Sequence, residues 1–138
     1  RAGGVGVEAR LGLGDGGAHV GTICDASYST FALIHWARDR KHGRKTVEDS
    51  VHRMSGATAD IIGLSDRGRI AAGLRADLNV IDLDRLALDE PEVHYTLPSG
   101  GRRLIQRAHG YMATLVAGTI VSRNDEPSGN LPGRLVRI

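Results

Sequence analysis

Cysteine, aromatic side chains and long apolar runs are all scarce in this sequence of 138 residues. The single cysteine, Cys24, excludes an internal disulfide bond. One Phe, one Trp and three Tyr are too few and too scattered to form a surface that stacks single-stranded bases. No apolar run approaches the roughly 18 residues that a membrane-spanning helix needs. These absences predict a cytoplasmic protein that has neither a membrane nor nucleic acid among its partners.

An excess of one charge sign is also missing. The 18 Lys and Arg residues are nearly balanced by 16 Asp and Glu, so the net charge is only +2. A field this weak does not draw in nucleic acid or anionic lipid. A basic run does occur between two predicted helices, where cations complement the carbonyl end of the first helix, so we interpret it as a solvated corner. It consists of Arg38, Arg40, Lys41, His42, Arg44 and Lys45.

Glycine, in contrast, is abundant. It accounts for 19 of the 138 residues, about double its usual share of ~7%. Residues 1–22 are especially rich in it, and their alternating valines and leucines predict a strand that ends near Gly14. The sequence begins at Arg1, without a methionine or a charged-then-apolar leader. We therefore expect no signal peptide here, and expect the chain to be a piece of a longer protein.

Two helices are predicted next. Asp25, Ser27 and Ser29 offer N-cap oxygens ahead of an apolar stretch over residues 31–37, and Gly43 follows as a terminator. The second helix begins with Thr46 and Asp49, which resemble a capping box. Apolar residues then recur at helical spacing through Ile61, and Gly63 ends the pattern.

Beyond residue 64 the pattern becomes that of strands. We predict one strand over residues 78–81, a hairpin of strands 112–116 and 119–121 around Ala117-Gly118, and a last strand over residues 135–138. The order does not alternate as a complete parallel α/β domain should. The predicted fold class is therefore an α/β part, residues 1–64, followed by a β part, residues 65–138.

The stretch Gly12–Gly17 matches the dinucleotide-binding pattern G-x-G-x-x-G. That site needs a helix N-terminus aimed at the pyrophosphate, but Gly21 and the loop after it intervene before any helix. Asp15 would also place a carboxylate among phosphate oxygens. We therefore expect no affinity for NAD or ATP.

Asp15 has two interpretations. An acid between glycines at the end of a strand can project into a cleft, but an aspartate is also common in turns, and residue type alone favours the turn. His19 is either a neighbour that contacts the same ligand or an ordinary loop histidine. The six histidines form neither H-x-H nor H-x-x-x-H, so this chain holds no complete metal motif. Nothing at fixed spacing marks a base for Cys24 as a nucleophile.

Several patches, taken in order, resemble the late part of the N-acyl-D-amino-acid deacylases (D-aminoacylases) of the amidohydrolase superfamily. The resemblance covers about residues 11–138. It is carried by Gly12–Gly21, Cys24–Ser27, His35–Arg40, Gly63-Leu64, Asp66–Gly68, Ile70, Gly73, Ala76–Leu78, Gly100–Leu104 and Pro132–Val136.

The resemblance implies a fold, a cofactor and a site. The fold would be the last strand and helices of a (β/α)8 barrel in residues 1–64, followed by the C-terminal strands of a small β-sandwich in residues 65–138. Asp15 would be the catalytic acid/base, taking a proton from metal-bound water that attacks the amide and returning it to the departing amine. It is also a candidate weak or shared ligand of the metal. Gly16, Gly17 and His19 would bind the substrate, an N-acyl-D-amino acid.

Zinc would be the cofactor of the intact enzyme, with its other ligands upstream of Arg1. The 138 residues alone are expected to bind no zinc and to be inactive. Their partner would be the upstream part of the same protein, with homo-oligomerisation as a further expectation. Two alternatives stay open: another amidohydrolase reaction, such as cyclic-amide (dihydropyrimidinase-like) hydrolysis, and a non-catalytic binding or assembly module whose strand edges pair with another chain.

Overall fold

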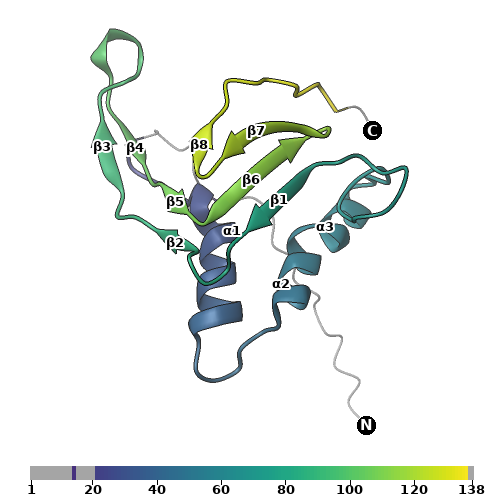
Figure 1. Ribbon diagram of the computed structural model, residues 1–138. Coiled ribbons are helices and arrows are strands. Elements are labelled where there is room, and N and C mark those ends of the chain that lie inside the picture. Colours follow the sequence, from purple (N-terminus) through teal and green to yellow (C-terminus); the bar gives the residue numbers. More distant parts are fainter. Residues whose placement is uncertain (1–13, 15–20, 137–138) are drawn as a thin grey trace.

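In the computed structural model, helices come first along the chain and antiparallel strands follow (Figure 1). The structure describes residue 14 and residues 21–136. The predicted strand ending near Gly14 therefore falls largely outside the described residues. Among the described residues, no helix is both long enough and apolar enough to cross a membrane.

The first helical segment runs from Asp25 to Asp39 in three parts. A 3-10 turn, η1 (Asp25–Ser27), leads into α1 (Tyr28–Phe31), which continues as the π-helical η2 (Ala32–Asp39). The predicted helix is confirmed, but the predicted capping is wrong, because no side chain caps η1 or α1. At Ser27 the backbone has φ −78° and ψ 2° in place of the extended conformation of an N-cap, because this residue already belongs to η1, and its hydroxyl is directed to Gln106, to which it donates. Gly43, with φ of +62°, lies in the turn beyond the segment.

The second predicted helix is capped as expected. Thr46 Oγ1 accepts a hydrogen bond from the Asp49 amide at 3.0 Å and opens α2 (Val47–Met54). The Asp49 carboxylate does not complete a reciprocal capping box, because it binds Arg53 Nε at 2.9 and 3.0 Å. This ion pair joins residues four apart on the helix surface.

The expectation of one helix through Ile61 is wrong at Ser55. That residue has φ −123° and ψ −87°, and α3 (Gly56–Ile61) starts afresh after it. The Ser55 hydroxyl donates to the Val51 carbonyl at 2.6 Å, a bond that competes with regular helix geometry. Gly63, with φ of +76°, lies just beyond α3 as predicted.

The strands form one four-stranded sheet and two short hairpin-like pairs. The sheet has the antiparallel order β1-β6-β7-β8, with β1 (Leu78–Ile81), β6 (Tyr111–Val116), β7 (Thr119–Arg123) and β8 (Glu126–Pro127). The pairs join β2 (Ala87–Leu88) to β5 (Ala108–His109), and β3 (Glu92–His94) to β4 (Arg103–Ile105), with the turn η3 (Pro98–Gly100) between the last two. In Figure 1 the β3–β4 pair projects as an arm from the rest of the chain.

The predicted strand at residues 78–81 and the predicted hairpin are both confirmed. Ala117 and Gly118 at the hairpin turn have φ of 49° and 78°, as a two-residue turn between twisted strands requires. The predicted last strand is wrong where it can be tested, because Leu135 and Val136 belong to no strand and are exposed. Residues 137–138 lie outside the described residues.

Arg38 joins the first helical segment to the loop between β1 and β2. Its Nη1 donates to the backbone carbonyls of Leu83 and Leu86, each at 2.7 Å. Arg40 lies over the Trp36 ring, 4.2 Å from its centroid. These two members of the basic run thus have structural partners, in agreement with the interpretation of the run as a structural corner.

The apolar core of the described residues is small. It contains Ala32, Leu33, Ala37, Ala57, Ala59 and Leu86. More than twice as many large apolar side chains are exposed, including Phe31, Ile61 and Ile70. The fold is therefore mixed, with helices followed by antiparallel strands; the barrel, the sandwich and the division near residue 64 stay predictions.

Candidate functional site

The predicted site residues Asp15, Gly16, Gly17 and His19 lie outside the described residues. Their neighbour Gly14 is described, and its backbone is pressed against the turn that begins the helix. A Cβ on Gly14 would lie 2.5 Å from Cδ1 of Tyr28 and would also collide with the Asp25 carbonyl oxygen. Only glycine permits this approach of backbone to backbone. The residue before the candidate acid is therefore in close contact with residues 25–28.

The same turn is bonded to the strand half of the chain. Ser27 Oγ donates a hydrogen bond to Oε1 of Gln106, which lies between β4 and β5. Gln106 Nε2 in turn donates to the Asp89 carbonyl at 2.9 Å. Both ends of the Gln106 amide are therefore occupied, so its orientation is fixed. Sequence reasoning missed this residue, although it lies two positions beyond Gly100–Leu104, one of the stretches that carries the family resemblance.

A second contact joins the two halves one helical turn later. The hydroxyl groups of Thr30 and Tyr111 are 2.6 Å apart. Thr30 is buried, so this bond satisfies a polar group that has little access to water. The Tyr111 amide donates to Asp125 Oδ1 at 2.7 Å, which fixes the start of β6. Two neutral hydrogen bonds thus attach the beginning of the helix to the strands.

A cavity of about 440 Å³ lies between the helices and β1. Its walls include Leu33 and Met54 from the helices and Leu78 from β1. Its two charged residues are each held by an ion pair: Arg69 contacts Asp60 at 2.5 Å, and Asp77 contacts Arg75 at 2.9 Å. The lining offers space for apolar groups, but no free acid and base for catalysis.

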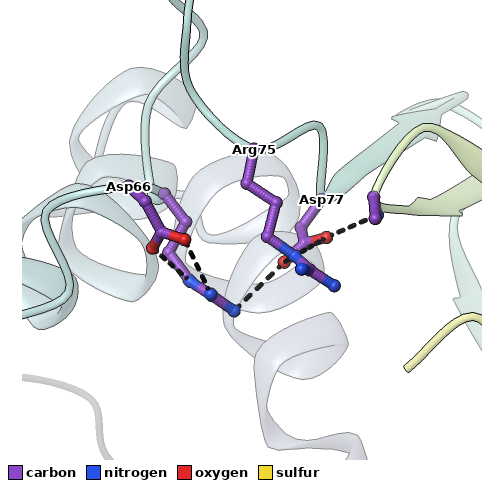
Figure 2. A network of polar contacts seen from close by, with 5 residues as sticks. Asp66, Arg75 and Asp77 are labelled. Carbon is purple, nitrogen blue, oxygen red and sulfur yellow. Dashed lines mark hydrogen bonds and ion pairs between the residues drawn. The ribbon is translucent and has the colours of Figure 1, made fainter. Parts of the chain in front are cut away.

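The loop around Asp77 is held by a network of polar contacts, drawn in Figure 2. Asp77 accepts from Arg75 Nε at 2.9 Å and from Arg67 Nη1 at 3.3 Å. Its Oδ1 also accepts from the Ala117 amide at 2.8 Å. Arg67 is bound in addition by Asp66, at 2.8 and 2.9 Å. This network ties the loop before β1 to the β6–β7 turn, so these residues hold the fold rather than a ligand.

The ionisation of Asp77 follows from these contacts. Burial opposes its charged form, but the Ala117 amide and the nearby Arg75 and Arg67 outweigh it, so the pKa of Asp77 lies below its ordinary value. The carboxylate is therefore charged in the folded protein even in mildly acidic solution.

No zinc site is found among the residues that the structure describes. No group of three or more His, Cys, Asp or Glu side chains is arranged to hold a metal ion there. Cys24 is a free, half-buried thiol. The nearest approach to a cluster is His109, whose Nε2 lies 2.8 Å from Asp89 and whose Nδ1 lies 3.9 Å from Asp125. These groups are not arranged to hold zinc among the described residues.

Comparison with known proteins identifies the family of this chain, which the described geometry alone does not. The sequence matches the amidohydrolase family over residues 9–122. It is also 36% identical over 96 residues to an N-acyl-D-glutamate deacylase of Alcaligenes xylosoxydans xylosoxydans. That alignment covers 67% of this chain but only 17% of the relative, so the chain spans about a sixth of the length of that enzyme. No solved structure matches the chain.

The family match extends across the Gly14 contact, both helical segments, the Asp77 network and the β6–β7 hairpin. It covers well over half of the chain. The D-aminoacylase-like resemblance of the sequence is thereby confirmed, and the chain belongs to the amidohydrolase family.

Proposed function

We propose that this chain is the C-terminal part of a zinc-dependent amidohydrolase that hydrolyses N-acyl-D-amino acids to a D-amino acid and a carboxylate. The observation that carries the proposal is the 36% identity to an enzyme named as an N-acyl-D-glutamate deacylase. The family likeness supports hydrolysis, and the likeness to that relative supports a linear amide as the substrate. Cytoplasmic location is part of the same proposal.

Asp15 is the proposed acid/base of this reaction. As a carboxylate it accepts a proton from the water that attacks the amide carbonyl, and it then returns that proton to the departing amino group. Gly16, Gly17 and His19 are proposed to bind the substrate next to it. Gly14, which precedes Asp15 in the sequence, is the described residue of this stretch, and it is in tight contact with Asp25 and Tyr28.

The described residues alone do not make an enzyme in this proposal. Zinc ligands are not among them, and many large apolar side chains, Ile70 and Phe31 included, are left exposed. Exposed apolar groups in such number are typical of a surface that another part of a protein covers. We propose that the upstream part of the same protein supplies both this cover and the metal ligands, and that the 138 residues alone are inactive.

The test is an assay of the complete protein that carries these residues. N-acetyl-D-glutamate and other N-acetyl-D-amino acids would be compared with their L-enantiomers, for the wild type and for Asp15→Asn. We expect hydrolysis of the D-series and a fall in kcat of about 10²–10⁴-fold in the variant. Asp84→Asn is the matched control, since this exposed aspartate is remote in the sequence from the proposed site.

Each result has a defined meaning. Wild-type activity in Asp15→Asn would refute the catalytic assignment. Hydrolysis of cyclic amides in place of N-acyl-D-amino acids would refute the substrate class and favour the dihydropyrimidinase-like alternative. The absence of hydrolysis of any amide by zinc-loaded complete protein would favour a binding module. Metal analysis before and after chelation tests zinc independently, because full activity without bound metal would contradict its role.

A further inference from the structure

We propose that the arm formed by β3 and β4 docks against the same arm of a second copy of this protein, through one of its two faces. The arm projects from the rest of the described chain (Figure 1). The docking face, named here the apolar face, carries Val93 and Tyr95 from the β3 side and Arg102 and Leu104 from the β4 side. The proposal does not depend on the proposed hydrolysis, because association is measured without an activity assay.

The pairing register assigns the side chains of the arm to its faces. Val93 pairs with Leu104 across the two strands. Successive residues of a strand point to opposite faces, so the pairs on either side of this one lie on the other face. The same alternation, continued by two positions on each strand, adds Tyr95 and Arg102 to the face of Val93 and Leu104.

The opposite face of the arm is polar, and its groups are bonded to one another. His94 Nε2 lies 3.0 Å from a carboxylate oxygen of Glu92. Arg103 Nε donates a hydrogen bond to Thr96 Oγ1 at 2.8 Å, which requires both side chains to lie on this face, in agreement with the alternation. The polar face is therefore satisfied within one copy of the chain.

The apolar face is open to solvent. Val93 is 52% exposed and Tyr95 is 70% exposed. Arg102 is exposed as well and forms no ion pair with a described residue, whereas arginines elsewhere in the chain bind aspartates. An exposed tyrosine beside an unpaired arginine and aliphatic side chains has the composition of an interface core.

This face is complementary to itself, which favours a second copy as its occupant. A two-fold axis parallel to the arm would place β3 of each copy over β4 of the other, at the roughly 10 Å that separates packed sheets. Val93 of each copy then meets Leu104 of the other, and Tyr95 meets Arg102. The first contact joins apolar groups, and the second joins a cation to an aromatic ring, an interaction that this chain already makes elsewhere.

The experiment measures self-association of the complete protein by sedimentation velocity over a range of concentrations. We expect a reversible dimer with a Kd in the micromolar range, since a face this small lies at the low end of interface areas. Tyr95→Ala should raise that Kd at least about 10-fold, as truncation of a central aromatic does. Arg102→Ala should raise it about 3–30-fold. Arg103→Ala is the matched control, because the same residue type one position away lies on the polar face, and it should leave the Kd within about two-fold.

Hydrogen exchange of the amides of residues 92–105 supports the same decision. A monomer at every concentration would overturn the proposal, and protection of these amides in that monomer would show that another part of the same protein covers the face. Equal effects of Arg102→Ala and Arg103→Ala would also overturn it, since the polar face would then contribute as much as the apolar one. If Tyr95→Ala does not fold, the comparison of the two arginines carries the test. Failure of the proposed function looks different, because Asp15→Asn tests that function by activity and should leave self-association unchanged.

Discussion

Two sets of hydrogen bonds join distant parts of this chain, and they do so with different chemistry. The loop over residues 64–77 uses charged groups, with Asp77 held between arginines and the Ala117 amide. The turn at residues 25–28 uses the neutral pair Ser27 and Gln106. The charged connection holds the β6–β7 turn, and the neutral connection holds the start of the first helix, against which the described Gly14 is packed. The contact that depends on pH is thus separate in the fold from the uncharged contact that holds the start of the first helix.

The largest effect is expected from Gly14→Ala. The new methyl group would lie 2.5 Å from the Tyr28 ring and closer still to the Asp25 carbonyl, so backbone must move. We expect kcat of the complete enzyme to fall by at least about 10²-fold, because the displacement is adjacent to Asp15. Gly133→Ala is the matched control, as its Cβ would meet open space. Near-normal kcat in Gly14→Ala would show that the turn does not constrain the site.

The second-largest effect is expected on stability, from replacing Arg38, whose guanidinium donates to three backbone carbonyls. Arg38→Ala leaves the carbonyls of Leu83 and Leu86 without their charged donor. We expect a loss of about 2–3 kcal/mol in the free energy of unfolding, as for hydrogen bonds to charged groups. Arg38→Lys should recover only part of it, since an ammonium cannot present the same planar donors. Urea denaturation measures both variants, and wild-type stability in Arg38→Ala would contradict the assignment.

The charged loop predicts a dependence on acid. Because the pKa of Asp77 is lowered by folding, its stabilisation is complete above the unfolded-state pKa of about 3.9 and is lost as pH falls through the folded-state value. Wild type should therefore lose hairpin stability as the pH falls below about 4, and Asp77→Asn should start lower and change less over this range. Hydrogen exchange of the β6 and β7 amides measures the effect. Parallel pH curves for the two proteins would exclude Asp77 as the cause.

The smallest effect is expected at the ion pair of Asp60 with Arg69, which joins the same types of side chain as the Asp77 network but is more exposed to solvent. Asp60 binds Arg69 at 2.5 and 2.8 Å, yet both side chains are about half exposed. Pairs of this kind contribute little, because water and salt screen them. Asp60→Asn should leave the melting temperature unchanged within error. A drop as large as that of Asp77→Asn would mean that charge alone, and not the link to the Ala117 amide, stabilises the loop.

The sequence predicted the features that depend on neighbouring residues. Thr46 caps its own helix, and the Ala117-Gly118 turn joins adjacent strands, so both signals lie within a few residues. The break at Ser55 could not be predicted in this way, since the local bond of Ser55 to Val51 is accompanied by packing against a distant loop: a Cβ on Gly68 would lie 2.8 Å from the Ala59 Cβ. The two-residue strands β2, β5 and β8 are too short to show a period.

The residues of the candidate site also differ in whether the sequence could predict them. Asp15, Gly16, Gly17 and His19 came from family resemblance, and they stay predictions because they lie outside the described residues. Gln106 carries no local signal, since its partner Ser27 is 79 positions away. A contact of that separation becomes visible only when the chain is folded. The metal likewise could not be placed, as the described residues contain no ligand set.

The long separation between Ser27 and Gln106 has a consequence for biosynthesis. A ribosome makes the chain from its N-terminal end, at about 5–20 residues per second. Ser27 and Thr30 therefore wait several seconds for Gln106 and Tyr111, which come 79 and 81 residues later. An incomplete chain that stops before residue 106 contains Ser27 and Thr30 but neither of their partners. Translation itself thus delays these contacts between helix and strands until most of the 138 residues have been synthesised.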